Sequence, residues 1–230
     1  MLDVIIALLP ATVAGCIIFG LSSVFVILAC VLSAVLFEYL FNLATKRTQT
    51  VSDLSAVVTG LLLALNLPAN TPIWQCVVGS AFAIIIVKCI FGGIGRNVVN
   101  PAITGRVFML IAFASMTKAA FPLDSTAGAT PLSEIANGNE VILTDLLLGN
   151  IGGSIGETCK VALLIGGVYL LIRRVITWHI PVSFIGTVAF LTYVFAPKTT
   201  DAVSFMIYSV LSGGLFLGAW FMALSSVCVK

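Results

Sequence analysis

The sequence predicts an all-α polytopic membrane protein with about eight hydrophobic helices. Three observations support this fold class. The 230 residues are 60% hydrophobic and 9% charged, whereas a soluble domain carries roughly 25% charged residues. The mean hydropathy is +1.19. The apolar residues are also grouped in long runs, and a water-soluble core of this size cannot hide so much apolar surface.

The apolar runs follow one another at residues 4–19, 24–43, 54–67, 73–91, 102–114, 159–172, 180–195 and 202–224. A helix needs about 20 residues to cross a bilayer upright. The third and fifth runs are shorter than this, so we expect them to be re-entrant, broken or enclosed by other helices. Irregular backbone at membrane depth is tolerated only within protein or beside a cavity, and broken helices often mark a binding site.

Two glycine-rich turns suggest a bundle built from an inverted repeat. Residues 91–97 read Phe-Gly-Gly-Ile-Gly-Arg-Asn and follow the fourth run. Residues 149–157 read Gly-Asn-Ile-Gly-Gly-Ser-Ile-Gly-Glu and precede the sixth. Paired turns in corresponding places of two halves are typical of many transporters. The match is short, so chance similarity is the alternative explanation.

The basic residues of the loops indicate how the chain is oriented. If the N-terminus is inside, the basic residues of the cytoplasmic loops are Lys46, Arg47, Arg96, Arg173 and Arg174. The opposite loops contain only Lys118 and Lys198. This distribution satisfies the positive-inside rule, and it predicts that the long polar stretch 118–157 lies outside the cytoplasm.

The stretch 118–157 contains a segment rich in hydroxyl groups. Ser125, Thr126 and Thr130 lie close together, and Pro131 restricts the backbone directly after Thr130. Hydroxyls held at a membrane surface are typical of an attachment point. An ordinary loop is the alternative interpretation, and composition alone favours it.

Glu38 is the most informative charged residue because it lies well inside an apolar run. An ionisable group at such a position is costly, so it is by default a hypothesis for a functional site. We therefore consider Glu38 a candidate for ion binding. The alternative is a carboxylate that reaches water, since Lys46 follows about two helical turns later. Asp53 and Lys88 lie nearer to the predicted cytoplasmic surface and are less informative.

Asn100 and Pro101 begin the fifth apolar run. Asn is a favoured N-cap residue and Pro is favoured at the first helical position, so we expect a capped helix start here. The alternative is the Asn-Pro-Ala signature of water channels. That signature needs two copies meeting at mid-membrane, and the chain contains one.

Several kinds of site receive no support from the sequence. The cysteines are scattered without a CxxC pair, so we expect no metal or disulfide role for them. The chain offers no set of nucleophile, histidine and carboxylate and no phosphate-binding loop, so we expect no catalytic residue. The single histidine, His179, follows Trp178 at a predicted interface and is expected to be structural. The net charge of +2 is too small to suggest a nucleic-acid partner.

Five stretches together resemble one family of membrane proteins. They read Phe-Glu-Tyr-Leu-Phe at 37–41, Val-Val-Thr-Gly-Leu-Leu-Leu-Ala-Leu-Asn-Leu-Pro at 57–68, Phe-Gly-Gly-Ile-Gly-Arg-Asn-Val-Val-Asn-Pro-Ala at 91–102, Gly-Arg-Val-Phe at 105–108 and Gly-Ala-Thr-Pro-Leu at 128–132. Their order and spacing resemble the RnfD/NqrB family. RnfD is a membrane component of the Rnf ion-translocating electron-transport complex, and NqrB is its homologue in the sodium-translocating NADH:quinone reductase. The resemblance implies one membrane domain over residues 1–230, with 118–157 as an extracytoplasmic, flavin-bearing loop.

The resemblance implies a membrane subunit of a redox-driven, ion-translocating ferredoxin:NAD⁺ oxidoreductase that is not catalytic alone. It implies FMN joined through its phosphate to a threonine, and Thr130 is the matching residue. Ala127 stands where the family usually has a serine, which leaves the threonine acceptor intact. A separate flavin transferase would attach the FMN outside the bacterial or archaeal cytoplasmic membrane. The resemblance also implies a second, non-covalent flavin such as riboflavin, and partners among the other Rnf subunits and the membrane lipids.

Glu38 matches an intramembrane glutamate of this family, and it is our candidate for binding Na⁺ or H⁺. The family pattern has a longer N-terminal lead-in and continues beyond residue 223 with a polar turn and further helices. We therefore expect this chain to lack the last helices. The alternative function is a secondary transporter or channel without a redox cofactor, and a third class is a purely structural membrane subunit.

Overall fold

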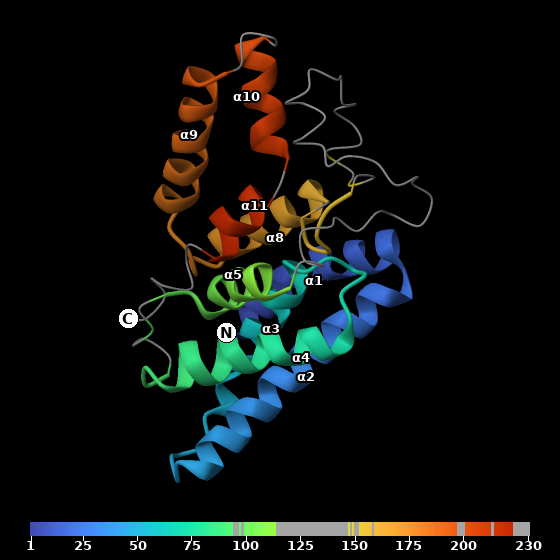
Figure 1. Cartoon of the computed structure of the whole chain (residues 1–230). Coiled ribbons are helices and arrows are strands. Elements are labelled where there is room, and N and C mark those ends of the chain that lie inside the picture. Colours follow the sequence, from blue (N-terminus) through green and yellow to red (C-terminus); the bar gives the residue numbers. More distant parts are fainter. Residues whose placement is uncertain are drawn as a thin grey trace.

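The computed structural model describes residues 1–93, 97, 99–113, 147, 149, 152–157, 159–196, 201–212 and 214–222. The elements of this part of the chain are helices, so the predicted all-α fold class is confirmed. Their order is shown in Figure 1.

The first two helices are the long ones. They are α1 (Leu2–Phe19) and α2 (Leu21–Ala44), and Gly20 separates them with a φ of 71°. This φ lies in the region that glycine adopts without steric cost, so a single residue can make the turn. Among the described residues, α1 and α2 are the two helices that by length and hydropathy are each able to cross a membrane.

The third helix, α3 (Ser55–Leu65), is short and is enclosed by protein. Its residues are apolar on every side, and nearly all of them are buried. A helix that is apolar all round is stable only when it is surrounded. At Gly60 a β-carbon would lie 2.8 Å from the Cys30 carbonyl oxygen of α2, so glycine allows the two helices to pack closely. The expectation that the short third run is enclosed is therefore confirmed.

The next run, α4 (Ile73–Ala81), continues without a break into a π-helix, η2 (Phe82–Cys89). The wider hydrogen-bonding pattern extends beyond the end of η2, where the Ile90 amide donates to the Ile85 carbonyl at 3.0 Å. Such π segments are rare and are frequently found at functional sites.

The fifth helix, α5 (Pro101–Ala112), begins as expected. The Asn100 side-chain oxygen accepts hydrogen bonds from the backbone amides of Ala102 and Ile103, at 2.9 and 3.4 Å. The predicted N-cap is therefore confirmed. The Asn100 amide group also donates to the Met222 carbonyl at 3.0 Å, so the cap also anchors a segment far along the chain.

The described part of the second glycine-rich turn, residues 152–157, lies in the interior. The Ile155 and Gly156 amides donate to the carbonyls of Leu67 and Leu65, at 3.0 and 2.8 Å. Ile155 is buried against Gly15 of α1. This turn therefore packs between α1 and the end of α3, and it leads into α8 (Lys160–Ile172), which packs along α1.

The C-terminal helices are α9 (His179–Val194), α10 (Ala202–Leu211), α11 (Leu215–Leu217) and the π-helix η4 (Gly218–Met222). In Figure 1, α9 and α10 stand together at the opposite side of the molecule from α2 and α4. The sequence predicted one continuous helix over 202–224, and this prediction is wrong. The chain is bent by 62° between α10 and the α11–η4 segment.

Candidate functional site

The structure describes one of the two predicted site residues. Thr130, the predicted flavin attachment point, lies outside the described residues, as do its neighbours Ser125 and Thr126. Glu38 lies on α2 and is 1% exposed. The alternative that Glu38 reaches water is therefore wrong for this structure.

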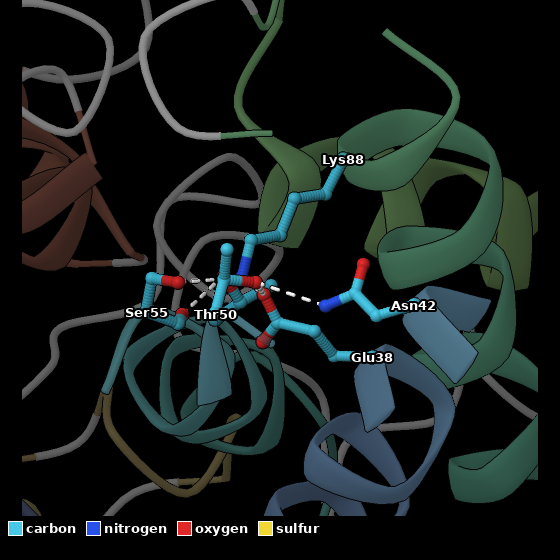
Figure 2. A network of polar contacts seen from close by, with 6 residues as sticks. Glu38, Asn42, Thr50, Ser55 and Lys88 are labelled. Carbon is cyan, nitrogen blue, oxygen red and sulfur yellow. Dashed lines mark hydrogen bonds and ion pairs between the residues drawn. The ribbon is translucent and has the colours of Figure 1, made fainter. Parts of the chain in front are cut away.

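Glu38 forms a buried ion pair with Lys88. The Lys88 Nζ lies 2.9 Å from Glu38 Oε1, and Lys88 is only 2% exposed. The same ammonium donates to Ser55 Oγ at 2.6 Å. These contacts are shown in Figure 2.

Two further side chains extend this polar network. Thr50 Oγ1 donates to Glu38 Oε1 at 2.7 Å. Asn42 Nδ2 donates to Thr50 Oγ1 at 3.1 Å, and Asn42 lies one helical turn after Glu38 on the same face of α2. We refer to Glu38, Asn42, Thr50, Ser55 and Lys88 together as the Glu38 network.

The Glu38 network joins elements that are distant in the sequence. Glu38 and Asn42 come from α2, Ser55 is the first residue of α3, and Lys88 comes from the π-helix η2. Thr50 lies in the connection just before the short helix η1 (Val51–Asp53). The network therefore couples two helices, a π-helix and a loop through one carboxylate.

The connection between α2 and α3 forms the outer wall of the network. The Arg47 guanidinium donates to the Cys89 carbonyl at 3.0 Å and lies over the Phe41 ring, 5.7 Å from its centre. Leu54 has a φ of 59°, which is uncommon for a residue other than glycine. This turn directs the chain into α3 and sets Ser55 beside Lys88.

The charges of Glu38 and Lys88 compensate each other in a dehydrated environment. Removing one partner of such a pair leaves an uncompensated buried charge, which typically costs about 3–5 kcal/mol. The second carboxylate oxygen, Glu38 Oε2, is buried and has no hydrogen-bond partner within the described part of the chain. The carboxylate therefore retains unused capacity to bind a donor or a cation.

The sequence interpretation undervalued Lys88. It placed Lys88 near the cytoplasmic surface, whereas the structure buries the ammonium against Glu38. A signal was available, because Lys88 also lies in an apolar run, and opposite charges in two membrane segments tend to pair. Asp53, which the sequence placed near the surface, is exposed. The roles of Thr50 and Ser55 had no signal in the sequence, since hydroxyl residues are common in loops and at helix ends.

Carboxylate and hydroxyl oxygens are the ligands that hard cations prefer. The Glu38 network supplies a carboxylate and two hydroxyls within one buried cluster. Within the described residues, no group of three or more His, Cys, Asp or Glu is placed to hold a metal ion. The arrangement thus fits a single monovalent charge better than a multivalent metal centre.

A second buried polar cluster lies in the turn before α8. Ser154 Oγ donates to the Glu157 carboxylate, and the Lys160 ammonium donates to the Glu157 backbone carbonyl. Lys160 is fully buried, but its described contact is with a residue three positions earlier. This cluster ties a turn to the start of its own helix and brings no distant elements together.

Known proteins resemble this chain along almost its whole length. Residues 1–229 match the model of a family described as the NQR2, RnfD, RnfE family. The chain is 43% identical over 231 residues to the RnfD subunit of the Na(+)-translocating ferredoxin:NAD(+) oxidoreductase complex of Acetobacterium woodii, a match that covers 97% of this chain and 70% of the relative. It is 36% identical over 245 residues to the RnfD subunit of the proton-translocating ferredoxin:NAD(+) oxidoreductase complex of Clostridium ljungdahlii, covering 100% and 74%. It is 36% identical over 260 residues to the corresponding subunit of the ion-translocating oxidoreductase complex of Alcanivorax borkumensis, covering 99% and 75%.

Proposed function

The chain belongs to the NQR2, RnfD, RnfE family, and from this premise we propose that it relays electrons through a covalent flavin and helps couple them to ion transport. It is a subunit of an ion-translocating oxidoreductase complex and a multi-pass bacterial membrane protein. The names of its relatives support a ferredoxin:NAD⁺ oxidoreductase of the Rnf type, with other Rnf subunits as partners.

The ion-coupling part of the proposal depends on one observation, the buried network around Glu38. A carboxylate in an apolar helix is costly unless it is compensated. Here Lys88 compensates the charge, while Thr50 and Ser55 contribute hydroxyl oxygens. We assign Glu38 to the ion path, with Na⁺ or H⁺ as the transported ion.

The electron-relay part assigns the FMN phosphate to the Thr130 hydroxyl. A phosphoester tether leaves the flavin ring free, so the bound group supplies the redox chemistry and the protein tunes it by contacts. A flavin transferase would make this bond, and the positive-inside pattern of the loops favours the extracytoplasmic side for the 118–157 loop. A non-covalent riboflavin elsewhere in the domain is the second flavin of the proposal.

In-gel fluorescence tests the flavin assignment directly. The chain is produced together with the flavin transferase, denatured, separated by electrophoresis and viewed under ultraviolet light. We expect a fluorescent band for the wild type and for Thr126→Ala, and none for Thr130→Ala, because only Thr130 would carry the phosphoester. A dark wild-type band under these conditions would show that the chain carries no covalent flavin.

The same test separates the proposal from its alternative, a secondary transporter or channel without a redox cofactor. The bent α10–α11 pair and the enclosed helix α3 are features that transporters share. Ion transport by a chain that carries no flavin would favour this alternative.

A further inference from the structure

We propose that Lys88 is a built-in competitor for the transported cation, so that the Glu38 site alternates between the Lys88 ammonium and Na⁺. This inference rests on the proposed function of Glu38 as an ion-binding residue and adds the device that opens and closes the site. It commits to Na⁺ because the oxygen ligands around Glu38 suit a hard cation.

The Lys88 ammonium lies where a bound cation would have to lie. Lys88 Nζ is 2.9 Å from Glu38 Oε1 and 2.6 Å from Ser55 Oγ. A carboxylate oxygen and a hydroxyl oxygen are also the groups that would coordinate Na⁺. In this structure the ammonium therefore occupies the place where the oxygens converge.

The charge balance of the site allows one cation at a time. Within the described residues, the Glu38 network contains one carboxylate and one ammonium. Since both groups are buried, adding Na⁺ while Lys88 stays in place would leave an unpaired positive charge in a dehydrated site. The two cations are therefore expected to exclude each other.

Oxygen atoms become available for Na⁺ when Lys88 leaves. Ser55 Oγ loses the donor from which it now accepts, and Glu38 Oε2 is already buried without a partner in the described part of the chain. Thr50 Oγ1 uses its proton toward Glu38 and accepts from Asn42, which leaves one lone pair. A Na⁺ ion would thus find ligands from α2, α3 and the loop between them.

The π-helix provides a way for Lys88 to withdraw. Lys88 lies in η2, next to the Ile90-to-Ile85 hydrogen bond that spans five residues. A π segment holds an extra residue in each hydrogen-bonded turn, so a return to α-helical spacing would rotate Lys88 about the helix axis without unfolding it. Arg47 holds the Cys89 carbonyl at the end of this segment, which places the contact that resists rotation beside the connection between α2 and α3.

A titration of Na⁺ against thermal unfolding tests the proposal on the assembled complex purified in detergent. Choline replaces Na⁺ at constant ionic strength. We expect Lys88→Met to be stabilised half-maximally at a Na⁺ concentration about tenfold or more below that of the wild type, because apparent affinity scales with the fraction of sites free of the competitor. Lys46→Met is the matched control, since Lys46 is exposed at the end of α2, and it should behave as the wild type.

The double variant Glu38→Gln, Lys88→Met should lose the Na⁺ effect, which ties the response to this site. An unchanged half-maximal concentration in Lys88→Met would overturn the proposal. So would a Lys88→Met complex that fails to accumulate in cells supplied with Na⁺, because Na⁺ should replace the missing ammonium. A Na⁺-insensitive Lys88→Met complex that still assembles would also overturn it and would favour a proton at Glu38.

The outcome is separable from that of the proposed function. Flavin fluorescence is measured on the same samples, and it depends on Thr130 but not on Lys88. Complexes that carry flavin and show ion-dependent turnover sensitive to Glu38→Gln, but no change with Lys88→Met, would refute only the role of Lys88. Turnover that is indifferent to Glu38→Gln would instead remove Glu38 from the ion path.

Discussion

Two lysines of the described chain are almost completely buried, and they are buried in different ways. Lys88 contacts a carboxylate and a hydroxyl from two other helices. Lys160 donates to the backbone carbonyl of Glu157, three residues earlier in the chain. The first ammonium is part of a tertiary ion pair, and the second is part of a local turn.

The two lysines together show that burial alone does not indicate function. A lysine that binds its own turn can be buried wherever the turn is packed, and its loss changes one local contact. A lysine that neutralises a carboxylate on another helix couples the positions of both helices to the charge state of the site. Only the second arrangement can report or control the presence of a cation.

The largest expected effect separates the two lysines. In Na⁺-free buffer, Lys88→Met leaves the Glu38 carboxylate buried without compensation and should destabilise the chain by about 3–5 kcal/mol. Lys160→Met leaves a backbone carbonyl without this donor and should cost about 1–3 kcal/mol. Thermal unfolding of the purified complexes measures both, and equal losses would contradict the distinction between them.

The next effect concerns the carboxylate itself. Glu38→Gln keeps the size of the side chain but removes its charge, so ion-dependent turnover should need about tenfold more ion or become ion-independent, a loss of about 1.5–3 kcal/mol of binding. The flavin should stay attached, because Thr130 is unchanged. Steady-state turnover against ion concentration, with in-gel fluorescence as the control, checks this expectation. Wild-type ion dependence in Glu38→Gln would exclude Glu38 from the path.

The smallest effect compares one hydroxyl from each cluster. Ser55→Ala removes an acceptor of the buried Lys88 ammonium and should cost about 1.5–3 kcal/mol, as expected for a hydrogen bond to a charged group. Ser154→Ala removes a donor to Glu157, which is partly exposed and can bind water instead, so the cost should be about 1 kcal/mol or less. Unfolding midpoints of the two variants give the ranking, and a reversed order would mean that the Glu157 cluster is the more strongly coupled one.

Several parts of the fold followed from the sequence because their causes are local. The start of α5 depends on Asn100 and Pro101, which act within one turn. The enclosure of α3 follows from a run that is too short to span a membrane and apolar on every side. Glu38 could be singled out because a carboxylate in an apolar run is unusual whatever surrounds it.

The parts that were missed depend on contacts between distant segments. The bend between α10 and α11 interrupts an apolar run whose hydropathy shows no break. At its far end, the Met222 carbonyl accepts from Asn100, more than a hundred positions earlier. The pairing of Lys88 with Glu38 joins residues fifty positions apart, and spacing along a chain cannot predict such a contact.

The sequence by itself determined that this chain is an all-α membrane protein of the NQR2, RnfD, RnfE family, because composition, apolar run length and motif order are properties of the chain alone. Only the tertiary structure decided that Glu38 is compensated, by which ammonium, and with which hydroxyls at hand. The physical reason is that the cost of a buried charge is set by its neighbours in space, and these come from three separate elements of the fold.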